Sequence, residues 1–378
     1  MNLRQLGALF LLLAALGASP AAADITTTGN HALLMDYESG QVLWAKDAFT
    51  PMPPASMSKL MTLELLFQRL KDGRVKLSDT FPVSERAWRE RSGSEMWVNI
   101  GDHITVENLI RGIITASAND GCIVVAEGIG GTVEGFVQMM NKRARELGLT
   151  QSHFVNPDGL DQPPGQAMSA YDLARLARHI IHDYPQYYHF FSEKDLSWSN
   201  IHQENRNPLL GAVPGADGLK TGHLEAAGYG LVGSAQRDGQ RIILVVNGLG
   251  SIKDRADEGA RLIEIGFREF RRYPLFKPGD TVATADVFGG ADKSVPLTVK
   301  APVAIVLQVD SRPGMKVAVR YNGPLKAPLA QNQRVATLVV SAPDFPGLSV
   351  PLYAARPVDR MGIFGRMMLG LRALIGSR

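Results

Sequence analysis

Cysteine is almost absent from this chain, which has 378 residues and one thiol, that of Cys122. One cysteine cannot form an internal disulfide, so a fold held together by disulfides is excluded. A metal centre would need further ligands, and no His-x-x-x-His pair lies near Cys122. The thiol lies in the apolar run 121–126, which favours a buried and unreactive side chain. We expect no metal and no cofactor.

A strong excess of charge is absent as well. Lysine and arginine number 40 and aspartate and glutamate 37, which leaves a net charge of +3. No basic run with interleaved aromatic residues occurs, so nucleic acid is not an expected partner. The shares of charged residues (20%) and hydrophobic residues (45%) are those of an ordinary globular protein.

The N-terminus lacks an apolar run long enough to span a bilayer. Arg4 precedes a short apolar run at 9–16, and three alanines follow at 21–23. This three-part pattern is typical of a secretory signal peptide, which we place at residues 1–23 with cleavage before Asp24. An uncleaved membrane anchor is the alternative. The pattern predicts an exported protein.

The rest of the chain is long enough for more than one domain. Residues 24–275 mix two kinds of pattern. Periodic apolar stretches predict helices at 56–70, 106–116, 123–128, 136–147, 170–182 and 257–271. β-prone runs predict a hairpin at 31–45 and another at 228–247, the second belonging to a central antiparallel sheet. We therefore expect an α+β domain.

Residues 276–356 have a different character. Short β-prone runs alternate with turns that contain Gly and Pro, and no helical pattern intervenes. The runs lie at 281–287, 303–309, 316–321 and 333–340. This pattern predicts a small all-β domain.

The tail, residues 357–378, has the pattern of an amphipathic helix. At helical spacing its apolar residues share one face, and these are Ile363, Phe364, Met367, Met368, Leu371, Leu374 and Ile375. Arg366 and Arg372 lie opposite. A basic amphipathic helix suits a membrane interface, so we expect the membrane surface as a partner. A helix packed against its own domain is the alternative.

Three short motifs carry the chemistry. In Ser56-Met-Ser-Lys59 a hydroxyl and an amine are three residues apart, so they project from the same face of a helix start. The lysine can accept the serine proton if burial lowers its pKa, and a helix N-terminus offers N–H groups to an oxyanion. Ser58 points elsewhere, so Ser56 is the expected nucleophile. By itself the spacing is common, and a capping serine beside a surface lysine would explain it.

The other two motifs are equally weak alone. Ser117-Ala-Asn119 interrupts two helical patterns and would project a hydroxyl and an amide into a cleft, although a plain turn explains it too. Asp120 beside it is expected to cap the next helix. Lys220-Thr-Gly222 precedes a β-prone run, where an edge strand could dock a carboxylate and the glycine lets another backbone approach. The three motifs in this order are typical of β-lactamases and penicillin-binding proteins.

With these motifs the chain resembles the low-molecular-mass penicillin-binding proteins of the D-alanyl-D-alanine carboxypeptidase group. The resemblance covers nearly the whole mature chain and implies a β-lactamase/transpeptidase-like catalytic domain at 24–275. Supporting stretches are Arg111-Gly-Ile, Asn156-Pro-Asp-Gly-Leu160, Asn205-Arg-Asn207, Lys220-Thr-Gly-His223 and Ala227-Gly-Tyr229. Two positions depart from the group's pattern: Ala118, where glycine is common, and Leu224, where threonine often follows the histidine.

The resemblance also implies a reaction. Ser56 would attack the carbonyl between the two terminal D-alanines of a peptidoglycan stem pentapeptide, with Lys59 as the general base. Water would then hydrolyse the acyl-enzyme. β-Lactam antibiotics would acylate Ser56 in the same way and leave slowly.

Further roles follow from the resemblance alone. Ser117 would relay the proton to the leaving amine with electrostatic support from Lys220, and Asn119 would hold the substrate amide. The other expected substrate contacts are Thr221 and Arg255 at the terminal carboxylate, Gly222 in the third motif, and the backbone N–H groups of Ser56 and His223 in the oxyanion hole. The side chain of His223 either takes part or only shapes the cleft.

Three other functions remain compatible with the sequence. A DD-endopeptidase that cuts cross-links would use the same residues. A β-lactamase would need a glutamate to activate the deacylating water, and no convincing equivalent lies between Asn119 and Lys220. A non-catalytic wall-binding protein could retain the cleft, although three complete motifs favour an enzyme. The signal peptide and tail predict a location on the periplasmic face of the bacterial inner membrane.

Overall fold

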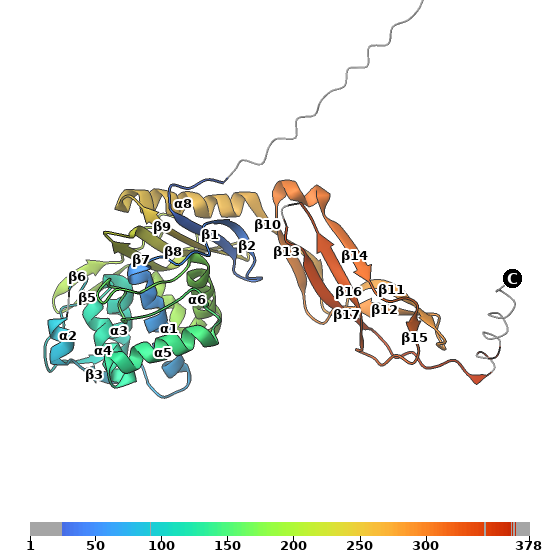
Figure 1. Ribbon diagram of the computed structural model, residues 1–378, viewed down its shortest axis with the longest axis horizontal. Helices are drawn as coiled ribbons and strands as arrows, with labels where there is room; N and C mark the ends of the chain where they lie inside the picture. The colour runs from blue at the N-terminus through green and yellow to red at the C-terminus, as the bar shows by residue number, and fades with distance from the viewer. Residues whose placement is uncertain (1–24, 91, 344, 364, 366, 368–378) are drawn as a thin grey trace, which may run out of the picture.

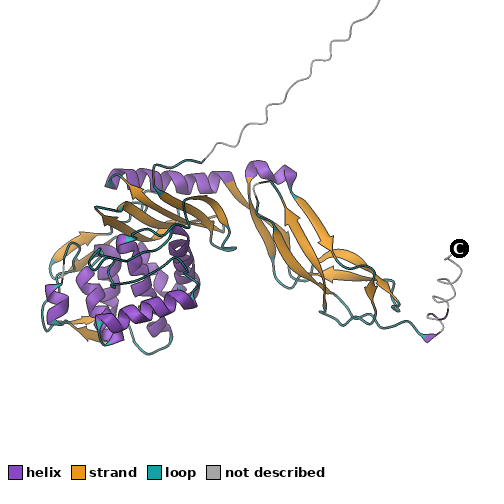
Figure 2. Cartoon of the chain, in the orientation of Figure 1, coloured by secondary structure: helices purple, strands orange, loops and turns teal. Residues whose placement is uncertain are grey.

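The computed structural model describes residues 25–90, 92–343, 345–363, 365 and 367. Two domains follow one another along its long axis (Figures 1 and 2). The first combines helices with a sheet, and the second consists almost wholly of strands. The predicted signal peptide at 1–23 and most of the predicted tail helix at 357–378 lie outside the described residues.

A five-stranded antiparallel sheet forms the centre of the first domain, with the strand order β2-β1-β9-β8-β7. The strands are β1 (His31–Asp36), β2 (Val42–Lys46), β7 (Ala216–Leu224), β8 (Gly228–Arg237) and β9 (Gln240–Leu249). Successive side chains alternate between the two faces, so Leu33 and Met35 join one core cluster and Leu34 the other. Both predicted hairpins are confirmed. The third motif lies on β7, which is an edge strand, as predicted.

Helices cover both faces of this sheet. On one face α8 (Ile252–Glu269) packs Leu262 and Ile263 against side chains of β1 and β9. The other face meets a larger group (Figure 1), formed by α1 (Lys59–Lys71), α3 (Val106–Arg111), α4 (Asn119–Gly130), α5 (Val133–Glu146), α6 (Ala170–Asp183) and α7 (Pro185–Tyr188). Smaller elements complete the domain: α2 (Glu85–Arg89) and the strand pairs β3–β4 (Thr80–Pro82, His103–Thr105) and β5–β6 (Asp195–Trp198, Ile201–Glu204).

Two helices at the motifs begin differently from the prediction. The helix expected from Ser56 starts as a 3-10 turn, Ala55–Ser58, and becomes α-helical only at Lys59. α4 starts at Asn119 rather than at 123, so the expected loop is shorter. Its first turn is polar because those side chains bond to another loop, and the apolar periodicity therefore begins later in the sequence.

The start and end of α8 also differ from the predicted range 257–271. Ser251 caps the helix, since its side chain accepts from the N–H of Asp254. The first turn is largely exposed, so apolar periodicity does not reveal it. The helix ends at Glu269, because the following residues enter strand β10 (Phe270–Phe276).

The second domain consists of two packed sheets. β10 pairs with β13 (Val303–Gln308), and six strands in the order β14-β16-β17-β12-β11-β15 form the larger sheet. These are β11 (Thr281–Phe288), β12 (Ser294–Thr298), β14 (Lys316–Arg320), β15 (Leu325–Lys326), β16 (Arg334–Ser341) and β17 (Leu348–Ala354). Apolar side chains of both sheets share one core. The predicted all-β character is confirmed, although a 3-10 segment, Val309–Gly314, follows β13.

The two domains are joined directly, with no loop between the last helix of the first and the first strand of the second. Phe270 is both the C-cap of α8 and the first residue of β10, so the second domain's first strand starts before the predicted boundary at 275. The Gln41 side-chain amide, in the turn after β1, donates to the carbonyl oxygen of Val306 at 2.9 Å. The end of the sheet in the first domain therefore contacts β13 of the second.

None of the described helices is by itself long and apolar enough to span a bilayer. Only α4 and α5 taken together meet the required length and composition, and they are bent by 83° at their break. Their buried apolar residues belong to the core of the first domain.

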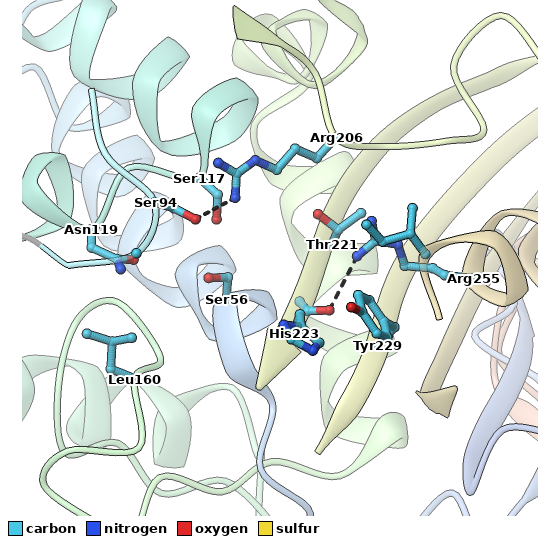
Figure 3. A pocket seen from close by; sticks show the side chains of 13 residues that line it. Ser56, Ser94, Ser117, Asn119, Leu160, Arg206, Thr221, His223, Tyr229 and Arg255 are labelled. Atoms are coloured by element: carbon cyan, nitrogen blue, oxygen red, sulfur yellow. Dashed lines mark hydrogen bonds between the residues drawn. The ribbon is translucent and has the colours of Figure 1, made fainter. Parts of the chain in front are cut away.

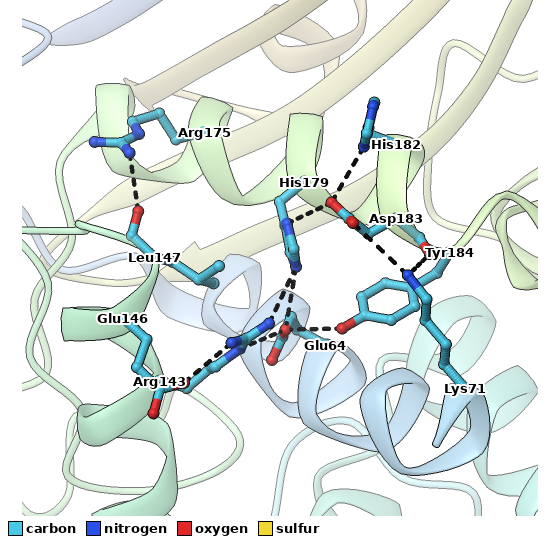
Figure 4. A network of polar contacts seen from close by, with 10 residues as sticks. All are labelled: Glu64, Lys71, Arg143, Glu146, Leu147, Arg175, His179, His182, Asp183 and Tyr184. Atoms are coloured by element: carbon cyan, nitrogen blue, oxygen red, sulfur yellow. Dashed lines mark hydrogen bonds and ion pairs between the residues drawn. The ribbon is translucent and has the colours of Figure 1, made fainter. Parts of the chain in front are cut away.

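A buried carboxylate ties α1 to its neighbours (Figure 4). Glu64 Oε1 accepts from Arg143 Nε on α5 at 2.8 Å and from the hydroxyl of Tyr184 at 3.0 Å. His179 Nε2 on α6 lies 3.3 Å from the same oxygen. Glu64 is fully buried, so these partners offset part of its lost hydration, while its other oxygen, Oε2, has no hydrogen-bond partner among the described residues. The network fixes the helix that begins with Lys59 against α5 and α6.

Candidate active site

Figure 3 shows Ser56 between the strand that carries Thr221 and His223 and the loop that carries Leu160. Both segments approach the first motif through glycines. A Cβ on Gly222 of β7 would lie 2.9 Å from the carbonyl oxygen of Pro54. A Cβ on Gly159 would lie 2.1 Å from the carbonyl oxygen of Ala55, and Gly159 has a φ of +84°. The expected close backbone approach at Gly222 is confirmed. Both segments can therefore reach the turn that carries Ser56.

Ser56 and Lys59 are in direct contact. Lys59 Nζ lies 2.7 Å from Ser56 Oγ. The same amine donates to Asn119 Oδ1 at 2.6 Å and to the backbone carbonyl of Asp158. The lysine is completely buried, and this burial lowers its pKa below the ordinary value. A neutral amine in this place can accept the proton of Ser56.

A second pair of hydroxyl and amine lies in the same cleft. Lys220 Nζ donates to Ser117 Oγ at 2.9 Å. Burial, with the nearby positive charges of Lys59 and Arg206, holds the pKa of Lys220 well below its ordinary value. Ser117 ends a π-helical turn, Gly112–Ala116, in a left-handed conformation with φ 59° and ψ 33°. Such a conformation is strained for a residue other than glycine, and it places the hydroxyl beside Lys220.

Asn119 joins the second motif to one wall of the cleft, a loop that we call the cleft-wall loop (residues 92–98). The backbone N–H of Asn119 donates to the Ser94 carbonyl at 2.7 Å. Its side-chain amide donates to the carbonyl of Ser92. With its side-chain oxygen on Lys59, Asn119 connects the loop with the lysine of the first motif.

Asp120 holds the same loop from beneath. Its buried carboxylate accepts from the N–H groups of Met96 at 3.0 Å and Val98 at 3.2 Å. The expectation that Asp120 caps α4 is wrong, because Ala118 is the N-cap residue and the helix has no side-chain cap. The Asp120 carboxylate is instead used in a tertiary contact, which a local sequence pattern does not indicate.

The cleft between these elements has a volume of about 570 Å³. Seven predicted residues line it, namely Ser56, Ser117, Asn119, Thr221, Gly222, His223 and Arg255. The other two, Lys59 and Lys220, are buried and reach it through the hydroxyls of Ser56 and Ser117. The structure thus brings all nine predicted residues together.

Two guanidinium groups face the cleft. Arg255, in the first turn of α8, lies over the ring of Tyr229 at 5.6 Å and donates to the Gly222 carbonyl at 3.4 Å. Arg206 donates to the hydroxyl of Ser94. Burial lowers the pKa of both arginines. Among the described residues neither has a carboxylate partner and no carboxylate lines the cleft, so the site suits an anionic substrate.

Arg206, Leu160 and Tyr229 line the cleft without having been assigned a role from the sequence. Each lies in one of the stretches that support the resemblance, and that was the only available signal. The side chain of His223 is exposed and stacks on Tyr229, with 4.0 Å between ring centroids and 24° between planes. Its ring therefore forms part of the rim of the cleft.

Cys122 is fully buried in the core of the first domain. Burial raises the pKa of its thiol to about 12. The prediction of a buried side chain is confirmed, and the raised pKa is consistent with an unreactive thiol. In the described ranges of the chain, no group of three His, Cys, Asp or Glu side chains is placed to hold a metal ion.

Comparison with known proteins connects this geometry to a family. A family model described as D-alanyl-D-alanine carboxypeptidase matches residues 17–250. The chain belongs to this family. A second model, described as the C-terminal domain of penicillin-binding protein 5, matches residues 270–360. The first model thus covers most of the first domain, and the second model covers the second domain.

Individual relatives match most of the length of this protein. The D-alanyl-D-alanine carboxypeptidase DacD of Escherichia coli (strain K12) is 36% identical over 342 residues, which is 89% of this chain and 88% of DacD. The structure of penicillin-binding protein 5 from Haemophilus influenzae is similar with a TM-score of 0.79 and 33% identity, covering 89% of this chain and 99% of that one. Penicillin-binding protein D2 from Listeria monocytogenes, solved in its ampicillin-bound form, has a TM-score of 0.57 and 28% identity, covering 65% and 99%. The expected fold class is confirmed.

Proposed function

We propose that this protein is a serine-type D-alanyl-D-alanine carboxypeptidase that removes the terminal D-alanine from peptidoglycan stem pentapeptides. The observation that carries the proposal is the presence of two hydroxyl–amine pairs, Ser56 with Lys59 and Ser117 with Lys220, at one cleft. Both amines are buried and favour the neutral form, as proton transfer requires. Family membership supports the same activity.

In the acylation step Ser56 Oγ attacks the carbonyl carbon of the terminal peptide bond. Its proton passes to the neutral amine of Lys59, and the carbonyl oxygen becomes an oxyanion that the N–H groups of Ser56 and His223 can stabilise. The intermediate collapses when the bond to nitrogen breaks. Ser117 donates its proton to that nitrogen and regains, through Lys220, the proton that Lys59 took from Ser56. Both amines are then neutral again, D-alanine leaves as an amine, and the ester remains on Ser56.

In the deacylation step water attacks the ester carbonyl and the bond to Ser56 Oγ breaks. One water proton returns to Ser56 through the lysines, and the shortened peptide leaves as a carboxylic acid. The balance is one water consumed for one peptide bond cleaved. No group outside the two pairs is needed to carry a proton.

The positive rim of the cleft supports a preference for a substrate with a free C-terminus. Thr221 and Arg255 line the cleft, and we expect them to hold the terminal carboxylate, with Arg206 adding positive charge. No carboxylate competes for these cations among the described residues. A substrate without a free C-terminus, such as a cross-linked peptide, is therefore expected to be cleaved more slowly.

A β-lactam presents an acylating carbonyl and a carboxylate to the same groups. We expect penicillin to acylate Ser56 and to leave slowly. The support is the related Listeria monocytogenes protein, which was solved in its ampicillin-bound form.

Release of D-alanine from a synthetic stem pentapeptide and covalent labelling by fluorescent penicillin test the proposal together. The Ser56→Ala variant is expected to lose both, because the nucleophilic oxygen is gone. Ser58→Ala is the matched control, since its hydroxyl bonds to the Ala55 carbonyl and faces away from the cleft. Labelling of Ser56→Ala at the wild-type level would contradict the assignment. Faster cleavage of cross-linked dimeric muropeptides than of pentapeptide would favour an endopeptidase instead.

We further propose that residues 1–23 direct export and that the tail at 357–378 holds the mature enzyme on the periplasmic face of the inner membrane. The support is the sequence pattern of both segments. The test is co-sedimentation of the mature protein and of a variant ending at Arg356 with vesicles that contain anionic lipid. Only the longer protein is expected to bind, and equal sedimentation of both would contradict the proposal.

A further inference from the structure

The cleft-wall loop presents one large aromatic side chain in an unusual conformation. Trp97 has a φ of 54°, in the left-handed region that bulky residues rarely adopt. Its neighbours Met96 and Val98 are fully buried, whereas Trp97 is 40% exposed. Within the described part of the chain, its indole has no stacking ring, cation or hydrogen-bond partner. An exposed tryptophan held in a strained conformation indicates a function for that residue.

The strain is maintained by contacts on both sides of Trp97. The Asp120 carboxylate accepts from the N–H groups of Met96 and Val98, the residues that flank it. The Met96 side chain fills the space above two glycines, since a Cβ on Gly112 would lie 2.5 Å from its sulfur. With both neighbours anchored inward, the indole is directed outward. Asp120 takes no part in the proposed proton transfers. Its role is to hold the cleft-wall loop in this conformation.

The loop that carries Trp97 is also part of the substrate cleft. Gly93 and Ser94 line the cleft, and Ser94 is bonded to Asn119 and Arg206. Trp97 follows Ser94 by three residues, so it lies within about 10 Å of the cleft along the chain. The indole is therefore carried by the same loop that forms one wall of the cleft.

We propose that Trp97 is a stacking platform for the N-acetylated amino sugar that carries the stem peptide. This inference rests on the proposed carboxypeptidase function. When the terminal peptide bond lies at Ser56, four residues separate it from the sugar, and they span about 13 Å when extended. That length allows the sugar to lie outside the cleft, within reach of the loop that carries Trp97. The C–H face and acetyl methyl of the sugar are apolar while its hydroxyls stay in water, which matches a half-exposed indole.

The experiment compares D-alanine release from N-acetylmuramyl-pentapeptide and from the free pentapeptide of the same sequence. For the wild-type enzyme, kcat/KM is expected to be about tenfold higher with the sugar-linked substrate, chiefly through KM, as one aromatic stacking contact provides. In Trp97→Ala that ratio is expected to fall to near one, and Trp97→Phe is expected to restore most of it. Ile100→Ala is the matched control, because Ile100 is a nearby apolar residue that is 55% exposed. A ratio in Trp97→Ala equal to that of the wild type would overturn the proposal.

A binding measurement separates this inference from the proposed function. Calorimetric titration of the Ser56→Ala enzyme with both peptides reports affinity without turnover. Tighter binding of the sugar-linked peptide that is lost in Ser56→Ala/Trp97→Ala supports the platform whether or not D-alanine is released. Equal affinities for the two peptides overturn it. If the wild-type enzyme releases D-alanine from neither peptide, the proposed function fails while the titration still decides the role of Trp97.

Discussion

Lys59 and Lys220 are enclosed by protein, and neither donates to a carboxylate side chain of the described residues. Their hydrogen-bond partners are hydroxyls, an amide oxygen and backbone carbonyls, which do not offset the loss of hydration of a full charge. Burial therefore favours the neutral amine and lowers both pKa values. The same burial that lowers the pKa of Lys59 leaves its amine in contact with the hydroxyl of Ser56.

This gives a prediction for the pH dependence of acylation. As pH falls through the lowered pKa of Lys59, the amine takes up a proton and can no longer accept that of Ser56, so the rate of acylation by penicillin falls. Lys59→Arg is expected to be slower by about a thousandfold at every pH, because a guanidinium stays protonated. Stopped-flow measurement with a fluorescent penicillin from acidic to alkaline pH checks both statements. A flat profile for the wild type would show that Lys59 is not the base.

Helix α1 connects the proposed catalytic pair, Ser56 and Lys59, to the ion pair of Glu64 with Arg143. Its first residue is Lys59, and Glu64 follows on the same helix, where the partners in α5 and α6 hold it. Glu64 is fully buried, whereas the other carboxylate bonded to Arg143, that of Glu146, is exposed. This ion pair therefore adds to the apolar packing that positions α1 beside α5 and α6.

We expect Glu64→Leu to lower the free energy of unfolding by about 3–5 kcal/mol, because it leaves the guanidinium of Arg143 and the hydroxyl of Tyr184 without their buried partner. Glu146→Gln removes the exposed partner of the same arginine, so its expected effect is about 0–1 kcal/mol. Urea denaturation of both variants measures the difference. Similar losses of stability would mean that the buried carboxylate does not fix α1.

The whole molecule contains separate cores. The first domain has two apolar clusters, one on each face of its sheet, and the second domain has a cluster of its own between its two sheets. Every residue that lines the cleft precedes Phe270. The chemistry therefore depends on the first domain, and the second is connected to it through β10 and the contact of Gln41 with Val306.

We predict that a mature chain ending at Glu269 still folds and is labelled by fluorescent penicillin at nearly the rate of the full-length protein. The reason is that both cores beneath the cleft are complete without the second domain. Circular dichroism confirms folding of the truncated chain, and gel fluorescence gives its labelling rate. A folded but unlabelled protein would show that the second domain supports the site.

Local periodicity made much of this fold predictable. α5 and α6 bury one face each, so their apolar residues recur at the spacing of a helix. β8 and β9 are buried on both faces, so they appear in the sequence as nearly continuous apolar, β-prone runs. The starts of α4 and α8 were missed because their first turns are polar. At Asp120 the polar side chain is used by a distant loop, and at Arg255 it faces the cleft.

The sequence by itself determined the order and spacing of three motifs, and with them the family and the expected nucleophile. Only the tertiary structure decided the state of those groups: the lowered pKa values of Lys59 and Lys220, the left-handed Ser117, and the contribution of Arg206 to the cleft. The physical reason is that burial and mutual distance set a pKa and a charge environment. Both depend on segments far apart in the chain, which spacing within a motif does not encode.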